Sequence, residues 1–289
     1  MLANVETCHY PHSPEQVVQL LQGKHQRILL LAGGTTASLS SDEKITDLVD
    51  LTRLGLEGIE ASDGGWRLGA TARLQQLASH PGLRRYAGGL VAEAAAAVGS
   101  RPIRNMATVG GNAVQVFRWS DPPVAYLALG AEFELLGPRG QRLLGADEFY
   151  RRHPRRQLER AEILTAVLLP AAGAAGRGAF IKLSRTSFDL AMASAAVWLQ
   201  AGGGGIERAR LVVGGMRTLP FRCRDAERLL AGKKPTPTLL ERLAQRVAEE
   251  VPATADVRTS ESYRRRLAGV AARRVVRTAW ERLSLEKQP

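Results

Sequence analysis

Two glycine-bearing segments of this sequence are suited to binding a ligand through the main chain. The first, Ala32-Gly33-Gly34-Thr35-Thr36, directly follows an apolar run at residues 27–31, and the second is Thr108-Val109-Gly110-Gly111-Asn112. Glycine has no Cβ atom, so the backbone can curl there and approach a ligand closely. Successive unpaired N–H groups in such a turn attract anions, and threonine hydroxyls add further donors. Acting together, the two segments predict a site that grips a diphosphate from two sides.

Other chemistry-bearing patterns are missing from the sequence. There is no G-x-G-x-x-G after a strand and no P-loop. The five histidines have no zinc-binding spacing, and the two cysteines, Cys8 and Cys223, are too few for an iron–sulfur or four-cysteine zinc site. Arginines beside Cys223 favour a lowered thiol pKa, whereas a buried position would leave the thiol passive. We therefore predict no catalytic and no metal-binding residue in this chain.

The composition is that of a globular protein with a strong positive charge. The 289 residues are 45% hydrophobic and 24% charged, enough for two modest domains. The net charge of +12 attracts polyanions, which include nucleic acid, nucleotide phosphates and an acidic partner subunit. An arginine-rich cluster at residues 151–156 is either a docking patch or a solvated turn. Nucleic-acid binding stays an alternative, although no aromatic–basic interleaving and no helix-turn-helix is recognisable.

The amino-terminal sequence and the apolar stretches favour a cytoplasmic protein. Residues 1–30 contain charged side chains and histidines and lack the apolar core of a signal peptide. The low-charge stretch at residues 88–99 is too short to span a bilayer. We therefore expect a cytoplasmic location, no membrane span and reduced thiols.

The elements that must position the two segments follow from periodicity and turn signals. The apolar run at 27–31 predicts a buried strand that ends at the first segment, and residues 104–112 predict a loop. Residues 171–178 are rich in Ala and Gly and predict a linker. Three strands and then three helices are expected after this linker, and strands followed by helices indicate an α+β fold, with one domain over 1–176 and a second over 177–289. Strands are expected at 45–50, 66–71, 131–136, 142–144, 163–169, 179–183, 194–201 and 206–214, and helices at 13–22, 88–98, 122–129, 225–230, 238–251 and 260–283.

Several stretches, in order along the chain, resemble one family. Leu29-Leu30-Leu31-Ala32-Gly33-Gly34-Thr35 is similar to the first flavin loop of molybdenum hydroxylase flavoproteins. Ile103-Arg104-Asn105-Met106-Ala107-Thr108-Val109-Gly110-Gly111-Asn112 resembles their second loop nearly residue for residue. Lys182-Leu183-Ser184-Arg185 and Ser262-Tyr263-Arg264 resemble the start and the final helix of their second domain. The chain is thus similar to the medium, FAD-binding subunits of carbon monoxide dehydrogenase- and xanthine dehydrogenase-type enzymes.

The resemblance implies a fold and a set of cofactor-binding residues. The fold is an FAD-binding domain of the PCMH (vanillyl-alcohol-oxidase-like) type with two α/β subdomains. A small carboxy-terminal domain with a three-stranded antiparallel sheet and a helix bundle follows it. The two loops are expected to cradle the FAD diphosphate and ribityl chain, Asp121 to accept hydrogen bonds from FAD hydroxyls, and Lys182 to lie near the isoalloxazine. The implied cofactor-binding residues are Leu30, Leu31, Ala32, Gly33, Gly34, Thr35, Thr36, Ala37, Val98, Thr108, Val109, Gly110, Gly111, Asn112, Asp121, Leu164 and Lys182.

The chain departs from the family pattern at two places. Thr36 and Ala37 stand where the family usually has an acidic or polar residue followed by leucine. Val116-Phe117-Arg118 and Trp119 stand where the family often shows Ala-Ser-Pro. Trp119 either shields the flavin ring or packs inside the domain.

The resemblance implies an electron-transfer subunit of a hetero-oligomeric, molybdenum-containing hydroxylase or dehydrogenase. FAD would take electrons from the [2Fe–2S] clusters of a small partner subunit and pass them to a terminal acceptor such as NAD, a quinone or oxygen. A large partner subunit would hold the molybdenum cofactor and oxidise the substrate. The departures leave open an FAD-free structural subunit of the same complex.

Overall fold

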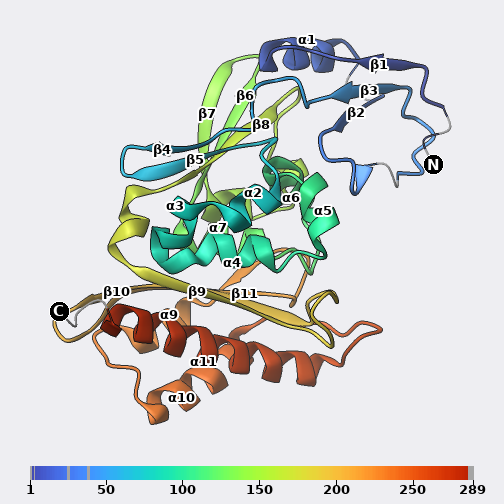
Figure 1. Cartoon of the computed structure of the whole chain (residues 1–289). Helices are drawn as coiled ribbons and strands as arrows, with labels where there is room; N and C mark the ends of the chain where they lie inside the picture. Colours follow the sequence, from blue (N-terminus) through green and yellow to red (C-terminus); the bar gives the residue numbers. More distant parts are fainter. Residues whose placement is uncertain (1, 3, 25–26, 38–39, 286–289) are drawn as a thin grey trace.

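The computed structural model describes residues 2, 4–24, 27–37 and 40–285 and is drawn in Figure 1. A small parallel sheet of three strands, in the order β1-β3-β2, forms the amino-terminal part. Helix α1 (Pro14–Lys24) buries Val17, Val18 and Leu21 in one cluster with Val49 of this sheet and Ile163 of the next. The helix therefore joins two sheets through one apolar core. The strands are β1 (Thr7–His9), β2 (Ile28–Leu31) and β3 (Asp47–Asp50).

A five-stranded antiparallel sheet, in the order β4-β5-β8-β6-β7, forms the middle of the molecule. Short helices rich in alanine and leucine pack with it, and α7 is buried at all eight of its residues. The strands are β4 (Ile59–Ser62), β5 (Gly65–Gly69), β6 (Glu132–Gly137), β7 (Gly140–Gly145) and β8 (Ile163–Leu169). The helices are α2 (Leu74–Ser79), α3 (Pro81–Arg85), α4 (Leu90–Ala96), α5 (Arg101–Met106), α6 (Val109–Val114), α7 (Pro122–Leu129) and α8 (Ala146–Phe149), with 3-10 turns η2 (Tyr86–Gly89) and η3 (Pro154–Arg156).

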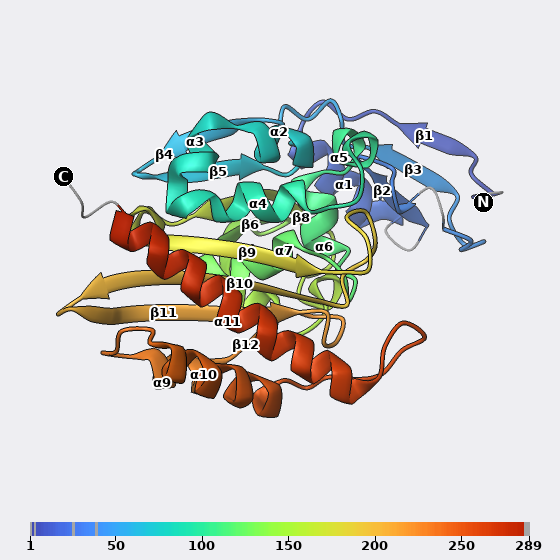
Figure 2. The same ribbon diagram turned by 60° about the horizontal axis from the view of Figure 1, so that its bottom comes forward.

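The carboxy-terminal sheet is antiparallel and has the order β12-β11-β10-β9. Strand β10 contributes side chains to two different cores. Successive side chains of a strand point in opposite directions, so each face of β10 packs in one of them. Ala195, Val197 and Leu199 pack with the carboxy-terminal helices, whereas Ala196 and Trp198 belong to the core of the middle part. Figure 2 shows α11 lying across this sheet. The elements are β9 (Arg177–Leu183), β10 (Ala193–Gly202), β11 (Gly205–Gly214), β12 (Phe221–Arg222), α9 (Arg224–Leu230), α10 (Pro237–Glu250) and α11 (Glu261–Leu285), preceded by η4 (Ala171–Ala175).

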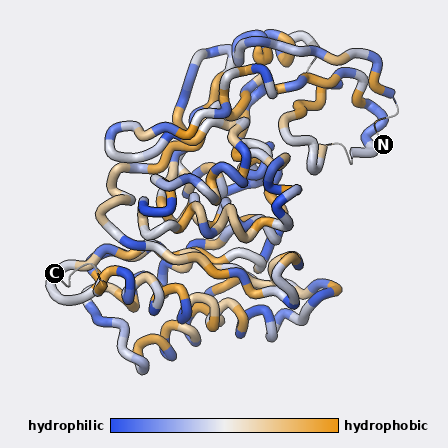
Figure 3. Tube along the Cα trace, in the orientation of Figure 1, coloured by the Kyte–Doolittle hydropathy of each residue, from blue (hydrophilic) through white to orange (hydrophobic). Residues whose placement is uncertain are grey.

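The α+β class and the three predicted strands of the second sheet are confirmed, and the structure adds β12 as a short fourth strand. The carboxy-terminal helices cover a sheet face (Figure 2). In Figure 3 long stretches of the strands are hydrophobic, and turns at the outer edges are mostly hydrophilic. None of the helices within the described ranges is long and apolar enough to cross a membrane.

The predicted linker at 171–178 is wrong. This segment forms η4 and the start of β9, and Gly173, Gly176 and Gly178 are buried in it. The Trp198 indole donates a hydrogen bond to the carbonyl of Gly173 at 3.0 Å, and a Cβ atom on Gly173 would lie 1.9 Å from the Tyr86 hydroxyl. The small residues of the segment thus make room for two large aromatic side chains from distant parts of the chain.

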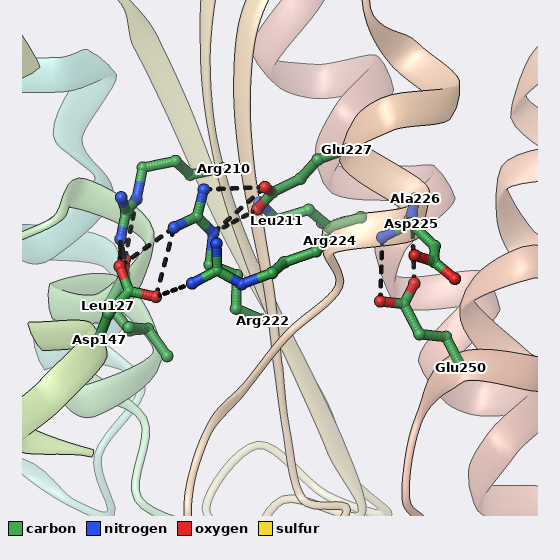
Figure 4. A network of polar contacts seen from close by, with 10 residues as sticks. All are labelled: Leu127, Asp147, Arg210, Leu211, Arg222, Arg224, Asp225, Ala226, Glu227 and Glu250. Atoms are coloured by element: carbon green, nitrogen blue, oxygen red, sulfur yellow. Dashed lines mark hydrogen bonds and ion pairs between the residues drawn. The ribbon is translucent and has the colours of Figure 1, made fainter. Parts of the chain in front are cut away.

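One carboxylate, Asp147 of α8, joins the middle part to the carboxy-terminal sheet (Figure 4). It accepts hydrogen bonds from Arg210 at 2.7 Å, Arg222 at 3.1 Å and Arg224 at 2.8 Å. Arg210 also donates to the carbonyl of Leu127 at 2.9 Å. Partial burial opposes the charge on Asp147, but hydrogen bonds and charges from Arg210 and Arg222 outweigh it and hold its pKa below the ordinary value.

Candidate functional site

The first glycine segment begins where β2 ends, at Leu31, which pairs with Asp50 of β3. The backbone then turns through Gly34, whose φ of +69° is the left-handed conformation that glycine adopts readily. A Cβ atom on Gly33 would lie 2.0 Å from the carbonyl oxygen of Met106 and 3.2 Å from the Cα atom of Ala107. The absence of a side chain therefore lets the first segment rest directly on the residues that precede the second.

The second glycine segment is the start of a helix, so the loop predicted for residues 104–112 is wrong. Helices α5 and α6 meet at Ala107 and Thr108, and Thr108 caps α6 by accepting the Gly111 amide at 3.1 Å. The Thr108 backbone is extended, and threonine in that backbone conformation is a favourable N-cap, which explains why the helix begins here. The sequence pattern showed the glycines but not the cap.

The amide groups of the second segment are already hydrogen-bonded, which corrects the expectation of free donors there. Val109 and Gly110 donate to the carbonyls of Ala72 and Ala70 at 2.9 and 2.8 Å. Gly111 and Asn112 donate within the Thr108 cap. This segment therefore offers an exposed backbone without side chains at Gly111, together with the positive end of a short helix dipole.

A buried carboxyl and a lysine lie at another part of the site. Asp121 is 3% exposed at the start of α7, and its Oδ1 atom has no hydrogen-bond partner within the described ranges. Burial raises its pKa from 3.8 to about 8, and the positive charge of Lys182 opposes that rise only partly. Lys182 of β9 donates from Nζ to the carbonyl of Ala97 at 2.5 Å, next to Val98. The structure thus brings Val98, Asp121 and Lys182 together from three distant parts of the chain.

Leu164 lies under the second glycine segment and shares an apolar core with Val109. It is 7% exposed on β8. The carbonyl of its neighbour Thr165 accepts the Ala70 amide at 2.9 Å, and the Ala70 carbonyl accepts Gly110. Leu164 therefore belongs to the layer beneath the second segment. Leu30, Leu31, Ala32, Thr35, Thr36 and Ala37 are all half-buried on or just after β2.

Two arginines position this region and were given no role from the sequence. Arg73 donates from Nη1 to the carbonyl of Met106 at 2.6 Å, the same oxygen that faces Gly33. Arg104 donates to the carbonyls of Val98 and Gly99, each at 3.1 Å. Arg104 stands inside the family-like stretch, which was its only signal, and nothing in the local sequence marked Arg73.

The aromatic residues that depart from the family pattern form a surface stack. Phe117 and Trp119 are parallel, with ring centroids 5.2 Å apart, and Trp119 is 36% exposed. Of the two alternatives for Trp119, packing inside the domain is therefore wrong. Cys223 is buried, and burial raises its pKa well above the ordinary value, which makes it a passive thiol.

The residues present fit FAD. The contact of Gly33 with Met106 places the two glycine segments side by side, where a diphosphate can lie against both. The orphaned oxygen of Asp121 is suited to a ligand hydroxyl, because a buried polar atom without a partner is costly. Lys182 adds positive charge near the same carboxyl. The arrangement can bind a polar, anionic cofactor and bias the charge on it.

Two family models match the chain. The model described as FAD binding domain in molybdopterin dehydrogenase matches residues 3–172, and the CO dehydrogenase flavoprotein C-terminal domain matches residues 178–279. The prediction of family is thereby confirmed, and the division at residues 176 and 177 stays a prediction.

Relatives and solved structures agree with these models. The chain is 31% identical to the carbon monoxide dehydrogenase medium chain of Afipia carboxidovorans over 278 residues, which covers 94% of this chain and 95% of the relative. It is 28% identical to the xanthine dehydrogenase FAD-binding subunit of Escherichia coli O157:H7, covering 86% and 88%. A chain in the structure of carbon monoxide dehydrogenase from Hydrogenophaga pseudoflava superposes with a TM-score of 0.90 at 28% identity, covering 98% and 99%. The chain belongs to the flavoprotein family of molybdopterin dehydrogenases, in which an FAD-binding domain is followed by the CO dehydrogenase-type carboxy-terminal domain.

Proposed function

We propose that this chain binds FAD and serves as the electron-transfer subunit of a molybdenum-containing hydroxylase or dehydrogenase. The contact of Gly33 with the Met106 carbonyl is the observation that carries the proposal, because it joins two cofactor-loop segments that lie more than seventy residues apart. Family membership and relatives that are FAD subunits support it.

Individual residues would hold FAD in distinct ways. The diphosphate and ribityl chain would lie against two stretches of the chain. These are residues 30–37, which include the first segment, and the glycines of the second segment. Asp121 would accept a hydroxyl hydrogen bond through its orphaned Oδ1, and Lys182 would keep a positive charge near the flavin. When bound, FAD accepts and releases electrons, which no protein side chain does as readily. The chain's own contribution is binding, orientation and electrostatics.

Two partner subunits complete the proposed complex. A small subunit with [2Fe–2S] clusters would supply electrons, and a large subunit with the molybdenum cofactor would oxidise the substrate. Support comes from relatives described as medium chains of carbon monoxide dehydrogenase and glyceraldehyde dehydrogenase. Under this proposal, hydroxylation chemistry would take place in the large subunit and not in this chain.

A second candidate is an FAD-free subunit that keeps the fold. One observation favours it: the amides of Val109, Gly110, Gly111 and Asn112 are all occupied by protein acceptors, so the second segment has few donors left for phosphate.

An absorption spectrum of the purified chain, before and after incubation with FAD and gel filtration, distinguishes the two. The proposal expects flavin bands near roughly 370 and 450 nm with one FAD per chain, a spectrum that belongs to the cofactor itself. A chain that stays colourless after reconstitution, while its circular dichroism shows it to be folded, would support the FAD-free subunit instead.

A further inference from the structure

The connection between α6 and α7 carries residues that depart from the family pattern, and it ends at Asp121. Phe117 and Ser120 close a turn within it. The Phe117 amide donates to the Ser120 hydroxyl at 3.0 Å, and the Ser120 amide donates to the Phe117 carbonyl at 2.9 Å. Asp121 stands at the N-cap position of α7, but its side chain makes no cap hydrogen bond. The place of its buried carboxyl therefore depends on the backbone of this connection.

Arg118 connects this turn to the segment that precedes α11. Its guanidinium donates to the carbonyl of Thr254 at 3.2 Å and to the Thr254 hydroxyl at 2.7 Å, and it pairs with Asp256 at 3.3 Å. The Arg118 carbonyl accepts the Gly215 amide at 3.0 Å. Both the side chain and the backbone of Arg118 are thus held by the carboxy-terminal part of the chain, three residues before Asp121.

The carboxylate that Arg118 contacts is itself held firmly. Asp256 also pairs with Arg258 and Arg264, each at 2.7 Å. Arg264 is fully buried and donates to the carbonyl of Met192 at 2.7 Å. Desolvation opposes the charge on Asp256, but hydrogen bonds from Arg258 and the nearby positive charges outweigh it and lower its pKa to about 2. Asp256 is therefore charged at neutral pH, and its pairing with Arg118 persists there.

A second arginine makes a matching set of contacts at the other end of α7 (Figure 4). Arg210 donates to the carbonyl of Leu127 at 2.9 Å and to Asp147 at 2.7 Å. The side chains of Arg118 and Arg210 are both 22% exposed, and each contacts a backbone carbonyl and an aspartate across the same two parts of the molecule. The two arginines differ in position, since Arg118 lies at the end of α7 that carries Asp121.

We propose that Arg118 is a positioning residue of the cofactor site. Through its contacts with Thr254 and Asp256 it holds the α6–α7 connection so that the orphaned oxygen of Asp121 meets a hydroxyl of FAD. This inference rests on the function proposed above. Because the connection is ordered before the cofactor arrives, less conformational freedom is lost on binding.

The test compares Arg118→Met with Arg210→Met, its matched control. Methionine keeps an unbranched side chain and removes the guanidinium with its charge and its donors. The affinity for FAD is measured by fluorescence titration of the apoprotein, with and without Asp121→Ala, and circular dichroism reports on folding. Arg118→Lys is a milder variant, which keeps the charge beside Asp256 but loses the fork of donors.

Arg118→Met should weaken FAD binding by about tenfold, and Arg210→Met by less than about twofold. Asp121→Ala should cost about tenfold in the wild-type chain and in Arg210→Met. In Arg118→Met it should cost less than about threefold, because the displaced carboxyl no longer meets the ligand. Arg118→Lys should bind FAD with an affinity between those of the wild type and Arg118→Met.

A second measurement requires no cofactor. Burial raises the pKa of Asp121, so the stability of the apoprotein should fall as the pH rises through the raised value. Arg118→Met should reduce this fall, because the carboxyl is no longer held in its buried place, and Arg210→Met should keep it. Urea denaturation at a series of pH values measures the difference.

Four results would each overturn the positioning role. They are wild-type FAD affinity in Arg118→Met, an equal loss in both arginine variants, a full tenfold effect of Asp121→Ala in the Arg118→Met chain, and an unchanged pH dependence of the Arg118→Met apoprotein. A wild-type chain that binds no FAD would contradict the proposed function instead. The apoprotein measurement would then still decide whether Arg118 holds Asp121 in place.

Discussion

Gly33 and Met106 meet as a backbone-to-backbone contact so close that the hydrogen atom on the Gly33 Cα is the largest group that fits. A methyl group at this position would lie 2.0 Å from the Met106 carbonyl oxygen, which is also held by Arg73. The relative position of the two glycine segments therefore depends on one missing side chain.

Gly33→Ala should separate these segments and lower the affinity for FAD by about tenfold or more, because the Met106 backbone must shift to make room. The measurement is a fluorescence titration of the apoprotein with FAD. Gly23→Ala in α1 is the control, since a Cβ atom there meets nothing within 4 Å. Equal affinities of the two variants would contradict the assigned role of Gly33.

Gly111→Val should also reduce FAD occupancy, because a branched side chain on this exposed residue would stand where the diphosphate is expected. A Cβ atom at Gly111 would lie 2.9 Å from the Thr108 hydroxyl, so the cap must be monitored as well. Thermal unfolding of the apoprotein reports on the cap, and the FAD-to-protein absorbance ratio reports on binding. Retention of FAD at wild-type stoichiometry would show that this segment does not contact the diphosphate.

Asp121 should make the stability of the apoprotein fall between about pH 4 and pH 8. Its pKa is raised by burial from 3.8 to about 8, so the neutral form is favoured in the folded chain. That stabilisation is fully present below the ordinary pKa and is lost as the pH rises through the raised value. Asp121→Asn should remove this pH dependence, as measured by urea denaturation at a series of pH values.

The same carboxyl offers a test of its proposed role toward the cofactor. Asp121→Asn keeps a hydrogen-bond acceptor and should retain most of the FAD affinity, whereas Asp121→Ala should lose about tenfold. Identical affinities for these two variants would place Asp121 outside the cofactor site.

Asp147→Asn should destabilise the protein by roughly 1–3 kcal/mol at neutral pH, because three arginines lose their shared anion. The pKa of Asp147 is lowered, so its contribution is present above the ordinary value and is lost as the pH falls through the lowered one. The difference from wild type in chemical denaturation should therefore vanish in acid. Glu241→Gln, which breaks an exposed pair with Arg273, is the control and should cost less than about 1 kcal/mol.

Local patterns in the sequence predicted most of the strands and the first glycine turn, but not β1, β4 and β12. The apolar run before Gly33 is β2, and the strand expected at 194–201 lies within β10. The helix at Thr108 was missed because two glycines are poor helix formers, and the cap is a single hydroxyl.

What the sequence could not predict depends on contacts between distant residues. The Ala/Gly-rich stretch around Gly173 looks like a linker until Tyr86 and Trp198 are placed against it. Likewise, Asp147 and Asp256 stand in unremarkable sequence, and only the fold gathers three arginines around each.

Strand β10 sends alternate side chains into two different cores. Unfolding of either core would expose one face of β10. The middle part and the carboxy-terminal part are therefore expected to unfold in a single cooperative transition. A hinge motion between these two parts would also have to separate side chains that pack together in one of the two cores. Lys182 of β9, the strand that pairs with β10, and Asp121 of the middle part are consequently set in place relative to each other when the chain folds.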